Sequence, residues 1–131
     1  MAEEEDAYAL LARGLELLDE GNPAQAALVL ERARAAAPSK GSILEALGRA
    51  YYSHRRFDAA SKCFSEAIEV DPANDYAHYC MGLCCLKHGK KTRAAGHFKL
   101  AWCMKPDEAY REMAGRFGAA GAVEPGAPGA G

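Results

Sequence analysis

Apolar side chains in the middle of the chain recur with the period of an α-helix. Four positions spaced i, i+3, i+4 and i+7 form one helical face: Leu44, Leu47, Gly48 and Tyr51. A second face follows with spacing i, i+4 and i+7: Ala60, Phe64 and Ala67. Residues with these spacings lie on one side of a helix, so each set predicts a helix with one apolar side. The segment therefore predicts two helices joined by a turn.

This pair of helices is repeated along the chain. Pro38, Pro72 and Pro106 are spaced 34 residues apart. Because proline cannot continue a helix interior, each one closes a unit. The units predicted in this way are 7–40, 41–74 and 75–108. Four further columns recur at the same period: Gly14, Gly48 and Gly82; Ala26, Ala60 and Ala94; Leu30, Phe64 and Phe98; Ala33, Ala67 and Ala101.

Turn residues lie between the two predicted helices of every unit: Gly21-Asn22-Pro23, His54-Arg55-Arg56 and His88-Gly89-Lys90. Such a hairpin cannot bury its apolar face alone, so hairpins are expected to pack on their neighbours and the last one needs a cap. A half-unit supplies the candidate, a seventh helix at about 107–117. Residues 1–6 are expected to be an acidic flexible leader, and the tail at 118–131, rich in glycine, alanine and proline, is expected to be disordered.

The recurring columns resemble the signature of the tetratricopeptide repeat (TPR) family, W-x2-L-G-x2-Y, then A-x3-F, then A and P. The resemblance covers residues 7–106, and the middle unit matches best. The departures are Leu10 and His78 at the tryptophan position, Arg13 at an apolar position and Cys85 at the tyrosine position. The resemblance implies an all-α fold, a right-handed solenoid of three helical hairpins with a C-terminal capping helix, over a domain at 7–117.

The resemblance also implies a protein–protein interaction scaffold. In this family the first helix of each unit lines a concave groove through its second, fifth, sixth, ninth, twelfth and thirteenth positions. The residues carried over as the partner-binding groove are Tyr8, Leu11, Leu15, Leu18, Glu45, Arg49, Tyr52, Tyr76, Tyr79, Leu83, Leu86 and Lys87. The remaining matched positions are Ala12, Asp19, Ser42, Ala46, Ser53 and Cys80.

Such a groove is mostly apolar and aromatic. A contiguous patch of this kind marks an interaction surface, so the expected partner is an apolar or aromatic helix or extended segment of another protein. Tyr52, Tyr76 and Tyr79 are the expected anchors. A plainer interpretation stays open, in which Leu15 and Leu18 are buried against the chain's own helices or the terminal helix fills the groove. The expected role is an adaptor or a small, co-chaperone-like protein.

One binding mode of the family is not expected. TPR domains that hold the acidic carboxyl terminus of heat-shock chaperones use lysine, asparagine and arginine side chains. The matching positions in this chain are Leu11, Leu15, Ala46, Tyr76 and Cys80. None of these side chains donates a strong hydrogen bond to a carboxylate.

The charge layout supports a second hypothesis. Residues 1–31 contain eight acidic side chains and one basic one, whereas 87–116 contain eight basic and three acidic ones. Opposite charges at the two ends predict head-to-tail self-association as an alternative function. The net charge of −2 and the absence of a nucleic-acid motif argue against nucleic acid as a partner.

No membrane association is expected, because no stretch approaches the roughly 20 apolar residues that a membrane helix needs. The acidic start lacks the positive region of a secretory signal, and the five cysteines have no disulfide-framework spacing. We therefore expect a cytoplasmic protein with reduced thiols.

The chemistry for catalysis or a cofactor is not apparent. Phosphate-binding glycine loops, G-x-S-x-G and H-E-x-x-H are absent from the sequence, so we expect no enzyme and no cofactor. Cys80, Cys84 and His88 share one helical face, but the four-ligand spacing of zinc sites is missing and no metal is expected. A metal sensor at this face, or redox sensing through Cys84 and Cys85, is a distant alternative. The four histidines have no evident acidic or nucleophilic partner.

Overall fold

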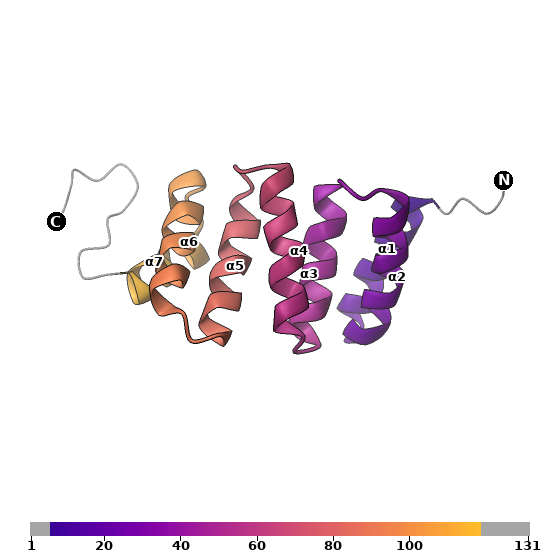
Figure 1. The fold of residues 1–131 in the computed structure, drawn as a ribbon, viewed down its shortest axis with the longest axis horizontal. Helices are drawn as coiled ribbons and strands as arrows, with labels where there is room; N and C mark the ends of the chain where they lie inside the picture. The colour runs from indigo at the N-terminus through magenta and orange to yellow at the C-terminus, as the bar shows by residue number, and fades with distance from the viewer. Residues whose placement is uncertain (1–5, 119–131) are drawn as a thin grey trace. The chain divides into compact units, whose positions relative to one another are not determined.

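The computed structural model describes residues 6–118, which form seven α-helices and contain no β-strand. The leader at 1–5 and the tail at 119–131, with the predictions made for them, lie outside the described residues. The helices follow one another as hairpins with short connections (Figure 1).

The first helices of the three hairpins are α1 (Ala7–Asp19), α3 (Gly41–Ser53) and α5 (Asp75–Lys87). The second helices are α2 (Pro23–Ala36), α4 (Phe57–Val70) and α6 (Lys91–Met104), and α7 (Glu108–Phe117) follows them. First helices begin at residues 7, 41 and 75 and second helices at 23, 57 and 91, always 34 residues apart. The period of the sequence is thus the period of the hairpins. The predicted all-α fold and its seventh helix are confirmed.

The three hairpin turns share one backbone geometry. Gly21, Arg55 and Gly89 have positive φ values of 81°, 62° and 74°. After each of them, a backbone N–H bonds the carbonyl five residues earlier at 2.8 Å, from Asn22 to Leu17, from Arg56 to Tyr51 and from Lys90 to Cys85. This pattern is the Schellman end of a helix. Glycine enters the left-handed region at little cost, whereas Arg55 adopts it against the usual preference of a side-chain-bearing residue.

The glycine column brings the two helices of a hairpin close together. A Cβ atom at Gly48 would lie 2.6 Å from the ring of Phe64, closer than real Cβ contacts come. The equivalent pairs are Gly14 with Leu30, at 2.5 Å, and Gly82 with Phe98, at 2.4 Å. The recurrence of glycine opposite a large apolar residue is therefore a packing requirement.

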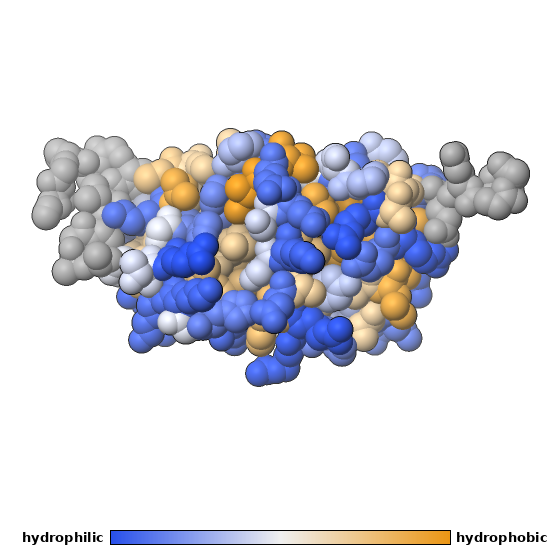
Figure 2. All heavy atoms as spheres, viewed as in Figure 1, coloured by the Kyte–Doolittle hydropathy of each residue, from blue (hydrophilic) through white to orange (hydrophobic). Residues whose placement is uncertain are grey.

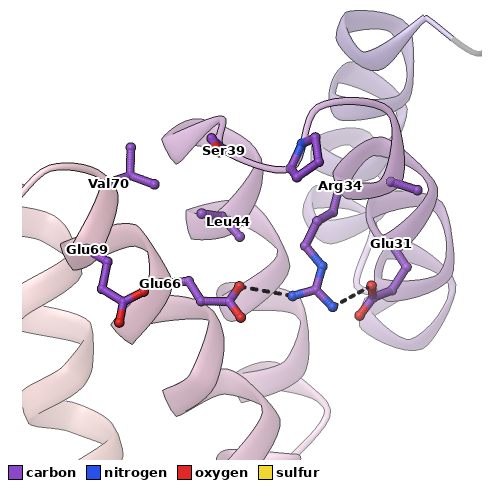
Figure 3. Close-up of a pocket in the computed structure, with 9 residues that line it drawn as sticks. Glu31, Arg34, Ser39, Leu44, Glu66, Glu69 and Val70 are labelled. Carbon is purple, nitrogen blue, oxygen red and sulfur yellow. Dashed lines mark hydrogen bonds and ion pairs between the residues drawn. The ribbon is translucent and has the colours of Figure 1, made fainter.

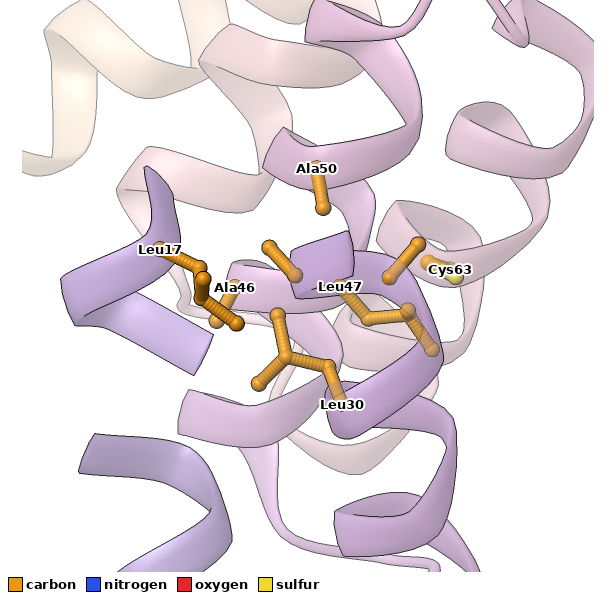
Figure 4. Packing of buried hydrophobic residues seen from close by; sticks show 8 residues of the cluster. Leu17, Leu30, Ala46, Leu47, Ala50 and Cys63 are labelled. Atoms are coloured by element: carbon orange, nitrogen blue, oxygen red, sulfur yellow. The ribbon is translucent and has the colours of Figure 1, made fainter. Parts of the chain in front are cut away.

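The chain divides into two compact units, one that ends at Pro72 and one that begins at Ala73, and each is described by itself. The first contains α1 to α4. Its core cluster consists of Leu17, Ala26, Ala27, Leu30, Ala46, Leu47, Ala50 and Cys63 (Figure 4). The second contains α5 to α7 around Cys85, Ala94, Phe98 and Ala114. The single domain over 7–117 stays a prediction.

Aspartate side chains cap the helices at both ends of the described chain. Asp6 Oδ1 accepts a hydrogen bond from the backbone N–H of Tyr8 at 3.0 Å, and Asp107 Oδ1 accepts one from Ala109 at 2.8 Å. Asp6, which the sequence prediction placed in the leader, is therefore the N-cap of α1.

On the face drawn in Figure 2, hydrophilic side chains predominate and hydrophobic ones reach the surface in separate patches. The large apolar side chains exposed to solvent are Tyr8, Leu15, Leu28, Val70, Leu100 and Met104. Within residues 6–118, the helices lack the combination of length and apolar character that crossing a membrane requires.

Candidate functional site

In the first unit, the candidate site begins with a row of leucines on α1. Leu11, Leu15 and Leu18 are spaced i, i+4 and i+7, so they share one side of the helix. Leu11 and Leu18 are half-buried and pack against the core cluster of this unit. Leu15, between them, is 36% exposed. The row therefore rests on the core and presents its middle member to solvent.

Helix α3, which contacts α1, contributes a second row with the same spacing. Glu45, Arg49 and Tyr52 are all half-buried. The ring of Tyr52 meets the ring of Phe57 edge-on, with 5.2 Å between centroids. Ala46 is only 2% exposed and belongs to the core, so its carry-over to the groove surface was wrong.

Tyr8 is the most exposed aromatic residue of the predicted groove. Its side chain is 66% exposed at the start of α1. Lys40 donates a hydrogen bond to the Tyr8 hydroxyl at 3.0 Å, and its ammonium lies 4.5 Å from the ring centroid. A ligand that covers Tyr8 would therefore also meet a lysine.

In the second unit, Tyr79 is half-buried. Its ring packs against Phe98, with centroids 5.8 Å apart, and against Tyr110 of α7 at 5.0 Å. The Tyr110 hydroxyl donates to Asp75 Oδ2 at 2.7 Å, which ties α7 to the start of α5. Burial, followed by the nearby Cys80, raises the pKa of Tyr79. The terminal helix thus occupies part of the Tyr79 surface.

The other predicted positions of the second unit differ in exposure. Tyr76 is half-buried, and so are Leu83 and Leu86, which pack against the core of this unit. Lys87 is exposed at the end of α5. Cys80 is 4% exposed, so it too was wrongly carried over to the surface.

An open cavity lies away from these rows, among α2, α3 and α4 (Figure 3). It measures about 740 Å³ and opens broadly to solvent. Arg34 spans it, with guanidinium nitrogens 3.0 Å from Glu31 and 3.1 Å from Glu66. The Tyr51 hydroxyl donates a short hydrogen bond to Glu31. Burial and this bond raise the pKa of Tyr51 to about 12.

Sequence reasoning missed this network. The pair Glu31 and Arg34 is spaced i, i+3 on one helix, which is a readable signal. Glu66 lies 32 residues from Arg34 in another hairpin, and neither residue belongs to a recurring column. The network joins two hairpins of the first unit, with one arginine between two carboxylates.

A histidine pair was also missed. His78 is 7% exposed, and its Nδ1 lies 3.2 Å from Nδ1 of His97, where one nitrogen donates and the other accepts. Burial lowers the pKa of His97, and the neighbouring His78 and Arg93 lower it further. His78 occupies the tryptophan column of the repeat, and this departure was the only signal in the sequence.

The potential metal ligands on the cysteine-rich face of α5 differ in exposure. Cys80 and Cys84 are buried, whereas His88 is exposed at the helix end. Among residues 6–118, no three histidine, cysteine or acidic side chains are grouped as a metal ion would require. Cys63, Cys84 and Cys85 are also buried, whereas Cys103 is exposed.

Known proteins match this chain in sequence. The pattern of the tetratricopeptide repeat family matches residues 11–60 and 45–109. Superkiller complex protein 3 is 32% identical over 100 residues in Mus musculus and 31% identical over 100 residues in Homo sapiens. These matches cover 76% of this chain and 6% of those proteins, so the chain spans a small part of the length of these relatives.

Solved structures share the fold. The Yersinia enterocolitica type III secretion chaperone SycD, in complex with a peptide of the translocator YopD, has a TM-score of 0.79 at 14% identity, covering 84% of this chain and 90% of that one. The second TPR of Spaghetti (RPAP3), bound to the HSP90 peptide SRMEEVD, has a TM-score of 0.75 at 21% identity, with coverages of 79% and 96%. Identities this low establish likeness of fold alone.

Proposed function

Because this chain belongs to the tetratricopeptide repeat family, we propose that it is an adaptor whose first-helix side chains hold an apolar or aromatic segment of a partner protein. The family is a protein-interaction fold, and both structural neighbours described above hold a peptide of another protein. The observation that carries the proposal is the leucine row of α1, in which Leu15 is 36% exposed between two half-buried leucines.

The rows on α1 and α3 suit a ligand with apolar anchors and polar flanks. Leu11, Leu15 and Leu18 provide apolar area on α1, while Tyr52 adds a large ring with a polar tip on α3. Glu45 and Arg49 carry opposite charges on the same row, so they orient a bound segment more than they select its net charge. An amphipathic helix or an extended strand with spaced apolar residues fits this chemistry.

The HSP90 peptide of the RPAP3 complex is a poor guide to the ligand of this chain. A peptide that ends in acidic residues needs cationic or amide donors in the groove. At the corresponding positions this chain has Leu11, Leu15 and Tyr76, while Ala46 and Cys80 are buried. We therefore propose a ligand bound through apolar contacts, with the chain in a co-chaperone-like role in the cytoplasm.

Leu15→Asp tests the proposal because Leu15 is exposed enough to accept a charge without unfolding the first unit. A photo-crosslinking residue placed at Ala12, exposed on α1, identifies the partner. The affinity of the purified partner is then measured for each variant by calorimetry. We expect Leu15→Asp to weaken binding by about 2 kcal/mol or more, which is the loss typical of a central interface residue.

Leu28→Asp is the matched control. Leu28 is 71% exposed on α2, outside the predicted groove, and the substitution is the same. It should leave binding unchanged. Equal losses from the two variants, or none from Leu15→Asp while both proteins remain folded, would reject the α1 row as the binding surface.

A further inference from the structure

A small open cavity lies between α6 and α7 in the second unit. It measures about 290 Å³ and is lined by Lys91, Thr92, Ala95, Gly96, Lys99 and Phe117. One wall is the amino-terminal half of α6, and the other is the carboxyl end of α7. None of these residues belongs to the first-helix surface of the proposed function, so a ligand here would use a second site.

The spacing along α6 produces a short channel with a cation at each end. Lys91, Ala95 and Lys99 are spaced i, i+4 and i+8, so they follow one side of the helix. Eight residues advance an α-helix by about 12 Å, which separates the two lysines along the axis. Between the two lysines, Gly96 has no side chain, and a Cβ atom placed there would meet nothing within 4 Å. A peptide backbone can therefore approach α6 closely.

The electrostatics of this channel favour an anionic ligand. Its lining contains no acidic residue, and no carboxylate within residues 6–118 forms an ion pair with Lys91 or Lys99. The N-cap, Lys90, provides no side-chain hydrogen bond to the start of α6, and the first turn contains no acidic residue. The free N–H groups and the helix dipole therefore add positive potential at the Lys91 end.

The described part of the second unit also has a positive net charge. Between residues 73 and 118 there are eight basic side chains and four acidic ones, a formal charge of +4. The basic residues are Lys87, Lys90, Lys91, Arg93, Lys99, Lys105, Arg111 and Arg116, and the acidic ones are Asp75, Asp107, Glu108 and Glu112. The Arg116 guanidinium also lies 5.3 Å from the centroid of the Phe117 ring, beside the apolar wall of the channel.

We propose that this channel binds the acidic segment Glu3–Glu5 of a second copy of the chain. With Asp6, these glutamates form the longest run of acidic residues in the sequence. In an extended backbone, Glu3 and Glu5 point to the same side and lie about 7 Å apart. The long side chains of both partners cover the remaining distance to Lys91 and Lys99.

Binding of this kind is head-to-tail. Each copy binds one neighbour through its acidic segment and another through its α6–α7 channel. The interface is therefore heterologous, and copies can add to form open chains. The attraction is between oppositely charged side chains, so association weakens as salt rises. This inference does not rest on the proposed function, because the adaptor surface and the channel share no residue.

Sedimentation velocity on the full-length chain tests the proposal through two charge-reversal variants. The wild-type mass should rise with concentration at low salt and fall to the monomer at about 1 M salt, where the Debye length is about 3 Å. K91E/K99E and E3K/E4K/E5K should each remain monomeric. A mixture of the two should regain association, because the intact acidic segment of one variant meets the intact channel of the other.

Lys87 and Lys105 provide the matched control, because both are exposed in the second unit and neither lines the channel or begins α6. K87E/K105E changes the charge by the same amount and should associate like the wild type. The acidic-segment variant keeps the test valid if K91E/K99E does not fold, because its substitutions replace none of the residues of the two described cores. A monomeric wild type at low salt would overturn the proposal.

Three other results would also overturn it. Association by both variants at the wild-type level would show that the channel and the acidic segment are not used. If K91E/K99E abolished association while E3K/E4K/E5K did not, a different segment would occupy the channel. A mixture of the variants that stayed monomeric would exclude pairing between the two intact sites.

Discussion

Gly48 on α3 lies against the ring of Phe64 on α4, with no space for a side chain between them. Phe64 is 1% exposed, so its ring has little room to move aside. A Cβ atom at Gly48 would lie 2.6 Å from that ring, and the same contact recurs in the other hairpins. The glycine is therefore required for its size, although glycine within a helix costs about 1 kcal/mol relative to alanine.

We expect Gly48→Ala to destabilise the protein by about 1–3 kcal/mol, the usual cost of overpacking a filled core. Gly96→Ala is the matched change, because Gly96 also lies within a helix but has open space around it. It should raise stability by about 0.5–1 kcal/mol through helix propensity alone. Urea unfolding of both variants provides the comparison. A Gly48→Ala protein as stable as the wild type would mean that the ring of Phe64 moves away.

At the scale of elements, polar pairs join helices that the apolar columns already bring together. Arg34 joins α2 to α4 through Glu66, and His78 joins α5 to α6 through His97. The histidine bond needs one nitrogen as donor and one as acceptor, so it is lost when both rings are protonated. This requirement makes the packing of α5 on α6 sensitive to acid.

We expect stability to fall below a pH of about 6.5, the pKa of histidine in the unfolded chain. The pKa of His97 is lower in the folded protein, so on acidification the unfolded chain binds its proton first. The contribution is fully present above that pH and is lost as pH falls toward the folded pKa, with a slope of at most about 1.4 kcal/mol per pH unit.

His97→Gln removes this titration while it keeps a hydrogen-bonding side chain. The free energy of unfolding, measured by urea titration across this pH range, should depend less on pH in His97→Gln than in the wild type. His54→Gln, at an exposed histidine in the turn after α3, should retain the wild-type dependence. An unchanged slope in His97→Gln would show that the pair does not control acid stability.

Considered as a whole, the molecule keeps four of its five cysteines buried. Cys63 is buried in the first unit, and Cys80, Cys84 and Cys85 are buried in the second. Cys103, on α6, is exposed. Buried cysteine behaves as a small apolar side chain, so the cysteine content is a packing feature at all positions but one.

The native protein should therefore show one rapidly reacting thiol with Ellman's reagent and five after denaturation. Cys103→Ser should abolish the rapid reaction, since a thiol reacts only where the reagent reaches its thiolate. Cys63→Ser should leave the rapid reaction intact. If the native Cys103→Ser protein still contained a rapidly reacting thiol, redox sensing through Cys84 and Cys85 would again be a candidate.

The candidate surface was predictable only in part. The spacing of Leu11, Leu15 and Leu18 marks one face of α1, and the TPR resemblance said which face to choose. The same rule predicted that Ala46 and Cys80 lie on the surface, whereas the structure buries both. A family position specifies direction around a helix, whereas exposure depends on how deeply the neighbouring helix packs.

The sequence by itself determined the helices, the 34-residue period, the turns and the family, because these follow from spacing within one or two helical turns and from its repetition. Only the tertiary structure showed that Arg34 meets Glu66, that His78 meets His97 and that Leu15 stays open. Those contacts join residues 32 and 19 positions apart, and of their four side chains only His78 lies in a column of the repeat. Local periodicity contains no information about such pairs, because each one depends on the position of a second helix.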